Sequence, residues 1–276
     1  MKIFISTDIE GLSGIPSWQW WKDNLNTTRE ILLRHLIPII KTIKEYDEQA
    51  EILIVDSHSK GENFSVFDLG DDCSNVYVIN GFPRVDYMMS GIDESYDAVF
   101  FVGYHSMAGD KGAMDHTYSS SSIYSVKING KEVGETTINS AFAGEFGVPV
   151  ALVIGQRELS EEIKTYLPWA VHGIVQESVG RFAVKSYPYT MVYQTLVNST
   201  RQALDNLLRG KVKPMKFASP INVEIHWLST AIADVVSQMP IMERVSPRIT
   251  RYVTDNWKDG FRWLLSAVYM SYLGQR

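Results

Sequence analysis

The sequence predicts an α/β fold in which a mainly parallel sheet is flanked by helices, with a smaller α+β region at the C-terminal end. Short apolar, β-rich runs alternate with helical patterns through the first two-thirds of the 276 residues, which is typical of parallel sheets buried on both faces. The last third consists mostly of two long helical patterns instead. We therefore expect two domains, residues 1–185 and residues 186–276.

Residue type and spacing predict the elements of the first domain. Lys2–Thr7 is an apolar run that predicts a strand. Apolar side chains recur at helical spacing over Thr28–Tyr46, although Pro38 should bend or break that helix. A strand at Ile123–Ile128 followed by Asn129–Lys131 predicts a hairpin, because Asn-Gly favours a tight turn. The other expected elements are the strands Glu51–Val55, Val76–Ile79, Ala98–Val102 and Pro149–Ile154 and the helix Glu135–Phe146.

The C-terminal domain is expected to begin after the break at Ser186–Thr190. An amphipathic helix is predicted over Thr190–Leu208 and a strand over Ile221–Ile225. The chain ends in a predicted helix over Asp255–Tyr272 that is rich in aromatic residues. This helix offers an apolar surface for packing on its own domain or for oligomerisation.

Composition excludes several classes of protein. The net charge of −6 argues against nucleic acid or an anionic membrane as the main partner, because both require a basic face. No apolar run approaches the roughly 20 residues that span a bilayer. Cys73 is the only cysteine, so no internal disulfide can form, and the N-terminus does not have the pattern of a signal peptide. We expect a cytoplasmic protein.

Chemically reactive side chains follow several of the predicted strands. Asp8 and Glu10 follow the first strand, His58 follows the second, and His105 follows the strand that begins at Ala98. Ligands of open parallel sheets bind outside the carboxyl ends of the strands, so these residues are expected at one rim. Glu135 begins a predicted helix.

Two imidazoles and three carboxylates form a donor set that suits Zn²⁺ and neighbouring divalent ions. Five ligands exceed what one catalytic zinc requires, and with Asp8 as a bridge they would suit two metals roughly 3.5–4 Å apart. Taken singly, each residue has a simpler interpretation. Asp8 could form a turn, Glu10 could be solvated, and Glu135 could respond to the helix dipole.

Five motifs, in order, resemble those of the M55 family of metallopeptidases, the DppA-type D-aminopeptidases. They are DIEGLSG at Asp8–Gly14, DSHSK at Asp56–Lys60, GYHS at Gly103–Ser106, MDHT at Met114–Thr117 and VGE at Val133–Glu135. The resemblance extends over about the first 155 residues, so residues 1–185 would be the metal-binding catalytic domain.

The resemblance implies a dinuclear zinc centre held by Asp8, Glu10, His58, His105 and Glu135, with two Zn²⁺ per subunit. It also implies that His116, in the MDHT motif, is catalytic, either as general acid and base or as nucleophile. Members of the family release N-terminal D-amino acids from short peptides and form ring-like homodecamers.

The sequence departs from the family pattern in two places. Asp115 precedes His116 where a small residue is expected, and a carboxylate there should raise the pKa of the histidine. Gln156 and Arg157 stand where acidic residues are expected, so the pocket rim should differ.

The function predicted is that of a zinc-dependent aminopeptidase that acts on short D-peptides. One alternative keeps the metals but takes an L-peptide or another amide or ester. Another is a non-catalytic, metal-stabilised binding or assembly protein. Ligand residues alone predict neither the physiological substrate nor its handedness.

Overall fold

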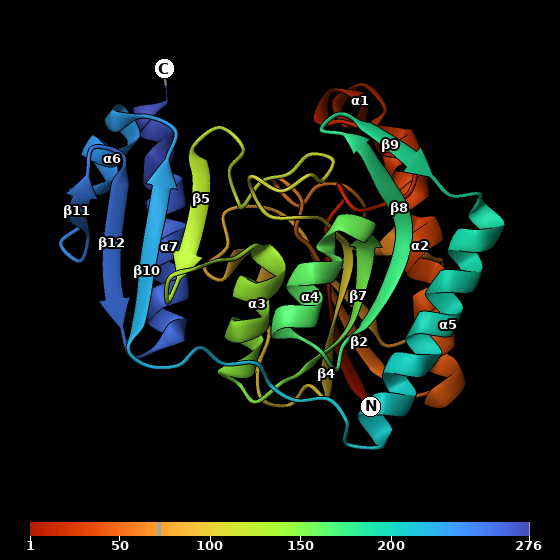
Figure 1. Ribbon diagram of the computed structural model, residues 1–276. Helices are drawn as coiled ribbons and strands as arrows, with labels where there is room; N and C mark the ends of the chain where they lie inside the picture. The colour runs from red at the N-terminus through yellow and green to blue at the C-terminus, as the bar shows by residue number, and fades with distance from the viewer. Residues whose placement is uncertain (71–72, 276) are drawn as a thin grey trace.

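The computed structural model describes residues 1–70 and 73–275, which form two sheets (Figure 1). Sheet A contains, in spatial order, β3 (Val76–Ile79), β2 (Glu51–Asp56), β1 (Lys2–Thr7), β4 (Ala98–Tyr104), β7 (Val150–Gln156), β8 (Val171–Gly180) and β9 (Ala183–Ser186). Its strands are parallel except for β9, which runs antiparallel to β8. The predicted α/β fold with a mainly parallel sheet is confirmed.

Sheet B is antiparallel and contains, in spatial order, β11 (Glu243–Ser246), β12 (Ile249–Thr254), β10 (Ile221–Trp227), β5 (Ile123–Ile128) and β6 (Lys131–Glu132). The predicted hairpin is present between β5 and β6. Asn129 and Gly130 have φ of 51° and 79°, the left-handed conformation that a tight two-residue turn requires.

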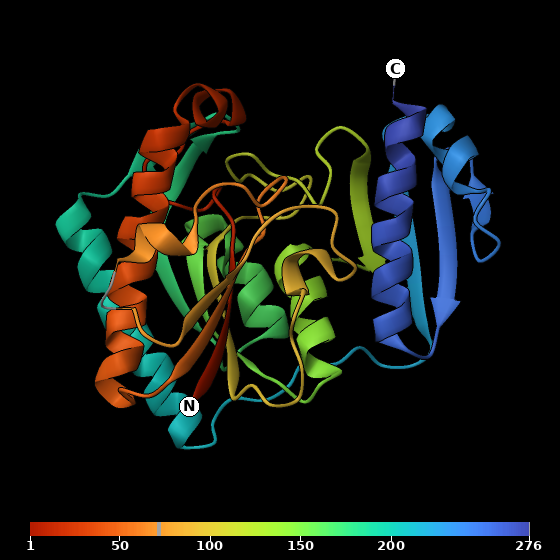
Figure 2. The same cartoon turned by 180° about the vertical axis from the view of Figure 1, so that it is seen from behind.

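Helices cover both faces of sheet A. The helices are α1 (Trp18–Asp23), α2 (Leu25–Tyr46), α3 (Glu135–Gly144), α4 (Ser160–Tyr166), α5 (Tyr189–Leu208), α6 (Thr230–Val236) and α7 (Trp257–Ser271), and the 3₁₀ turns are Val66–Leu69, Tyr87–Met89, Arg157–Leu159 and Tyr272–Gly274. Helices α2 and α5 lie side by side on the outer face of sheet A, and α3 and α4 lie on the face toward sheet B (Figures 1 and 2). Helix α7 packs against both α3 and β12, so it joins the two halves of the molecule.

The helix predicted over Thr28–Tyr46 is present, and Pro38 does not break it, because α2 continues to Tyr46. Pro38 is buried with the apolar face of α2, which packs on sheet A. An internal proline costs a helix about 3 kcal/mol or more. Burial of several large apolar side chains, at roughly 1.5–3 kcal/mol each, offsets that cost.

Two apolar cores lie on the two faces of sheet A. In β1, Ile3 and Ile5 face the core beneath α2 and α5, whereas Phe4 faces the core shared with α3, α7 and sheet B. Two contacts cross the expected domain boundary. Strand β5, from residues 1–185, pairs with β10, and α5, from residues 186–276, packs against β7 and β8 of sheet A. The division into domains 1–185 and 186–276 stays a prediction.

Candidate metal centre

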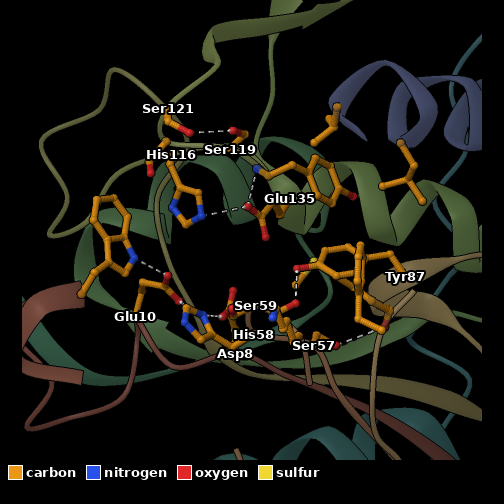
Figure 3. Close-up of a pocket in the computed structure, with 18 of the residues that line it drawn as sticks. Asp8, Glu10, Ser57, His58, Ser59, Tyr87, His116, Ser119, Ser121 and Glu135 are labelled. Carbon is orange, nitrogen blue, oxygen red and sulfur yellow. Dashed lines mark hydrogen bonds and ion pairs between the residues drawn. The ribbon is translucent and has the colours of Figure 1, made fainter. Parts of the chain in front are cut away.

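The side chains expected at one rim do lie together. Asp8 follows the carboxyl end of β1, His58 that of β2, and His105 that of β4. These three strands are neighbours in sheet A. Glu10 lies two residues beyond Asp8, and Glu135 is the first residue of α3, which points its N-terminus at the same rim. Figure 3 shows Asp8, Glu10, His58 and Glu135 around one cavity.

Asp8 lies at the middle of this group, with one carboxylate oxygen toward each imidazole. Its Oδ1 is 3.0 Å from His58 Nδ1, and its Oδ2 is 3.5 Å from His105 Nε2. The same His58 nitrogen lies 3.1 Å from Glu10 Oε2, and the same His105 nitrogen lies 3.7 Å from Glu135 Oε1. Asp8, Glu10 and His58 therefore form one set of donors, and Asp8, His105 and Glu135 form a second. A third group, Glu10, His105 and His116, also brings its donor atoms together, but only the first two share Asp8 and are fully buried. Within each set the donor atoms lie within 4.8 Å of one another.

Burial of the group makes a bound cation physically reasonable. Glu10 is 0% exposed, and its Oε2 accepts no hydrogen bond although it lies within ion-pair distance of His58. His105 Nε2 is also buried and makes no hydrogen bond. Buried charged and polar atoms are costly unless they are paired or coordinate a metal. The unpartnered atoms point toward the other members of their sets, as metal ligands would.

The electrostatics of the centre favour positive charge. Burial raises the pKa of Asp8 and of Glu135. Burial opposes ionisation of Glu10 as well, but the His58 imidazole outweighs it and holds the pKa of Glu10 well below its usual range. Burial would lower the pKa of His58 and His105, yet the surrounding carboxylates outweigh it and raise both pKa values to about 10. Three carboxylates thus create a strongly negative field within the fold.

His116 lies against the second donor set. Its ring stacks on His105 with centroids 4.3 Å apart and planes 7° apart. Its Nδ1 lies 2.9 Å from the Met114 carbonyl oxygen, and its Nε2 lies 3.7 Å from Glu135 Oε1. Because a neutral imidazole that donates through Nδ1 has its lone pair on Nε2, the basic nitrogen faces the carboxylates.

The two strand ends are held together by unusually close backbone contact. The Asp8 amide donates to the Val102 carbonyl at 2.7 Å, and the Gly11 amide donates to the Gly103 carbonyl at 2.8 Å. A Cβ atom at Gly11 would lie 1.9 Å from the Tyr104 carbonyl oxygen. Only glycine permits this approach, which sets the Asp8–Glu10 segment beside His105.

A cavity of about 510 Å³ contains the centre. Such a volume is ordinary for sites that bind small molecules. The rim of sheet A forms one part of its wall, through Asp8, Glu10 and His58, and α7 forms another, through residues such as Leu265 and Val268. Both halves of the molecule therefore enclose the centre.

Comparison with known proteins identifies the family. The family model for peptidase M55, the D-aminopeptidases, matches residues 1–266. The chain belongs to the M55 peptidase family of D-aminopeptidases. A curated D-aminopeptidase from Bacillus subtilis (strain 168) is 30% identical over 246 residues, which is 87% of this chain and 86% of the relative. The solved structure of the Zn-dependent D-aminopeptidase DppA from Bacillus subtilis, a self-compartmentalizing protease, matches with a TM-score of 0.90 and 26% identity, and the match covers 99% of this chain and 98% of that one.

One departure from the M55 pattern has a different effect from the one expected. Asp115 does not raise the pKa of His116, which burial and the neighbouring His105 lower instead. The Asp115 carboxylate is turned away to Arg181 Nε at 2.9 Å and to the Gly109 amide at 2.9 Å. The negative charge of Asp115 is therefore compensated locally.

The second departure lies beneath the M55 site. Gln156 is buried and donates to the carbonyl oxygens of Glu10 at 3.2 Å and Ala113 at 2.7 Å. Gln176 donates to the same Glu10 carbonyl at 2.6 Å. Gln156 is thus a support for the Glu10 backbone and does not line the cavity. Arg157 is exposed and pairs with Glu177 at 2.9 Å.

Several contacts of the candidate centre were not predicted from the sequence. Trp18 donates its indole N–H to Glu10 Oε1 at 2.6 Å, and the Trp21 ring stands edge-on to His58 at 4.4 Å. The Tyr118 amide donates to Glu135 Oε1 at 2.7 Å. The tryptophans of S-W-Q-W-W at Ser17–Trp21, two residues after the first motif, were a signal for the contacts of Trp18 and Trp21.

Asp56, the last residue of β2, supports the loop that follows it. Its carboxylate accepts from the Asn63 amide at 2.6 Å and from the Asn63 side chain at 2.8 Å, so it shapes the loop that carries His58. His105 Nδ1 lies 2.9 Å from the Ser106 carbonyl oxygen, which is the second-nitrogen contact expected of a ligand histidine.

Proposed function

We propose that this protein is a zinc-dependent aminopeptidase that removes N-terminal residues, D-amino acids in particular, from short peptides. Membership of the M55 family and the likeness to the Bacillus subtilis enzyme support this activity. The structural observation that supports it most directly is the position of Asp8, shared by two buried sets of donors. A carboxylate shared between two sets suits a pair of neighbouring metal ions.

We infer that Asp8, Glu10 and His58 hold one zinc ion and that Asp8, His105 and Glu135 hold a second. The donors are nitrogen and carboxylate oxygen, which zinc prefers when no thiolate is present. When bound, zinc would polarise the scissile carbonyl and lower the pKa of water at the site toward about 7. The buried acceptors and imidazole nitrogens without hydrogen bonds support this assignment.

The residues around the donors have separable tasks in peptide hydrolysis. His116 Nε2 accepts the proton of the attacking water and returns it to the leaving amine, so that water and amide become acid and amine. Its Nδ1 contact with the Met114 carbonyl fixes the ring and the tautomer for this step. Trp18 holds one oxygen of Glu10, and the Tyr118 amide holds one oxygen of Glu135.

Two variants test the assignment of roles. His116→Ala should retain zinc, measured by elemental analysis, and should lose hydrolysis of D-alanyl dipeptides. Glu135→Ala should lose zinc while its far-UV circular dichroism stays that of the folded protein. His226→Ala is a matched control, because His226 lies in sheet B, outside the donor sets. Retained turnover by His116→Ala, or full zinc occupancy in Glu135→Ala, would contradict the assignment.

The substrate class is tested separately. A panel of p-nitroanilides and amides of both hands should show faster hydrolysis of D- than of L-residues. Faster hydrolysis of the L-series, or of esters, would indicate the alternative metal-dependent hydrolase. If hydrolysis is absent and zinc removal strongly lowers the melting temperature, the metals are structural.

Assembly and location are further parts of the proposal. We infer a homo-oligomer, with a decamer as the expected size, and a cytoplasmic location. The self-compartmentalizing neighbour supports an assembly. No helix among the described residues is long and apolar enough to cross a membrane. Analytical ultracentrifugation of the zinc-loaded protein tests the oligomer directly.

A further inference from the structure

One wall of the cavity comes from residues outside every ligand motif. Helix α7 and the turn that follows it contribute Leu265, Val268, Tyr269 and Tyr272, and the segment before β4 contributes Phe82 and Tyr87. We call these six residues the aromatic wall. In Figure 3, Tyr87 lies across the cavity from Glu10. Trp18 donates to Glu10 Oε1, so it lies on the Glu10 side.

One residue of the aromatic wall, Tyr87, has a backbone conformation that costs energy. Tyr87 has φ of 41°, a left-handed conformation that is rare for a bulky residue and tends to occur at functional sites. Arg84 holds this turn, since its guanidinium donates to the Gly81 carbonyl at 2.6 Å, the Asp56 carbonyl at 2.8 Å and the Tyr87 carbonyl at 3.2 Å. The Tyr87 hydroxyl donates to the Ser59 carbonyl at 3.2 Å, beside the His58 loop.

The two parts of the wall are fastened to each other. Arg262 of α7 bonds both oxygens of Asp86, at 2.8 and 3.2 Å. The rings of Phe82 and Tyr269 meet edge to face at 5.5 Å. Phe82 and Tyr272 are nevertheless 45% and 49% exposed. Large aromatic surface left open beside a cavity is typical of a binding surface.

The other side of the cavity has a different character. It contains Trp18 beside Glu10 and Trp21 beside His58, with Lys22 next to Trp21 in the chain. Lys60 also lines the cavity, one residue beyond Ser59. Neither lysine makes an ion pair with any residue that the structure describes, and both are exposed. The aromatic wall is therefore mainly apolar, whereas the side near Glu10 and His58 carries Lys22, which has no ion-pair partner among the described residues. Ser119 and Ser121 line the cavity near Glu135.

We propose that the aromatic wall is the pocket for the side chain of the substrate's N-terminal residue, and that it selects large apolar or aromatic side chains. This deepens the proposed aminopeptidase function and rests on it. Lys22, next to Trp21 on the opposite side, attracts the peptide's C-terminal carboxylate, so the leaving residue lies there. The scissile amide then lies between the two sides, over the donor sets. Helix α7 thereby becomes the element that sets specificity.

Two isomeric dipeptides test this orientation. D-Phe-D-Ala and D-Ala-D-Phe have the same composition and differ only in which residue is N-terminal. We expect kcat/KM at least about 10-fold higher for D-Phe-D-Ala, because a well-filled apolar pocket discriminates by about that much or more. Val268→Phe, which fills the pocket, should reduce this ratio at least about 10-fold. Ser266→Phe adds the same group to the exposed face of α7 and should leave the ratio unchanged.

A second variant and a binding measurement keep the test decisive. If Val268→Phe does not fold, as judged by circular dichroism, Tyr269→Ala replaces it and should lower the ratio by removing aromatic contact. Calorimetric titration of the zinc-loaded protein with D-phenylalanine and D-alanine should show tighter binding of D-phenylalanine, lost in the same variant.

The outcomes separate the two proposals. A ratio near one or below it, or equal effects of Val268→Phe and Ser266→Phe, overturns the aromatic-wall pocket while the aminopeptidase stands. Hydrolysis of neither dipeptide overturns the aminopeptidase. In that case the titrations decide on the pocket, and equal binding of the two amino acids overturns it as well.

Discussion

Replacing Gly11 by alanine would add a methyl group where two backbone segments touch. The new Cβ would lie 1.9 Å from the Tyr104 carbonyl oxygen and 2.8 Å from the Gly103 carbonyl carbon. Real Cβ contacts essentially never fall below 3.0 Å, so the segments must separate by about 3.0 − 1.9 = 1.1 Å. The Gly11–Gly103 hydrogen bond of 2.8 Å would lengthen or break.

That movement separates the Asp8–Glu10 segment from His105. Metal–ligand distances in bound sites fall within about 0.2 Å of their usual values, and a misplacement of about 1 Å can cost roughly 100-fold in rate. We expect Gly11→Ala to lower kcat/KM for D-alanyl dipeptides by about 100-fold and to lower zinc affinity. Overpacking should also reduce the free energy of unfolding by about 1–3 kcal/mol.

The assay combines zinc content, steady-state kinetics and thermal melting. Gly180→Ala is the matched control, because a Cβ at Gly180 meets nothing within 4 Å and its φ is not in the left-handed region. Wild-type zinc content and kcat/KM in Gly11→Ala would refute the view that close contact of the two strand ends builds the centre.

Two further predictions concern residues around the centre. Glu162 Oε1 accepts from the Gly134 amide at 2.9 Å and from the Thr137 amide and hydroxyl at 3.2 and 2.5 Å, at the start of α3. Glu162→Ala leaves these donors unpaired, so chelator competition should show zinc affinity lower by about 10–100-fold, and unchanged affinity would count against the idea. His35 donates to the Ile31 carbonyl at 2.8 Å and accepts from the Ser13 amide at 3.4 Å, and burial lowers its pKa from 6.5 to about 4. Its contribution to the free energy of unfolding, about 3 kcal/mol, should be present above pH 6.5 and be lost as the pH falls toward 4, and His35→Gln should flatten that part of a stability–pH curve. An identical curve for this variant would show that another group is responsible.

Periodicity predicted the elements in which apolar spacing is regular. The bounds of β1, β3 and β5 were predicted without error, and α2 and α5 within a few residues. The strands β8, β9, β11 and β12 were missed, because polar residues interrupt their apolar patterns. Pro38 does not break α2, because burial of the helix outweighs the local cost of an internal proline.

The sequence predicted which residues meet at the rim but not how they are held. Strand order is not visible in the sequence, yet carboxyl ends of parallel strands share an edge, and this was enough to bring Asp8, His58 and His105 together. The roles of Gln156 and Asp115 depend on the direction in which each side chain points. Direction is set by tertiary contacts, such as that of Asp115 with Arg181, and no motif encodes it.

The hairpin β5–β6 precedes β10 by many residues but lies in the same sheet, where β5 pairs with β10. This pairing limits where the gene can be shortened. In a fragment that stops before β10, the edge of β5 that pairs with β10 would be exposed. In a fragment that starts after β6, β10 would lack its neighbour β5. Unpaired strand edges recruit other chains and promote aggregation. Truncated versions should therefore be insoluble when made alone, and co-expression of the two fragments is the rational route to recovering them.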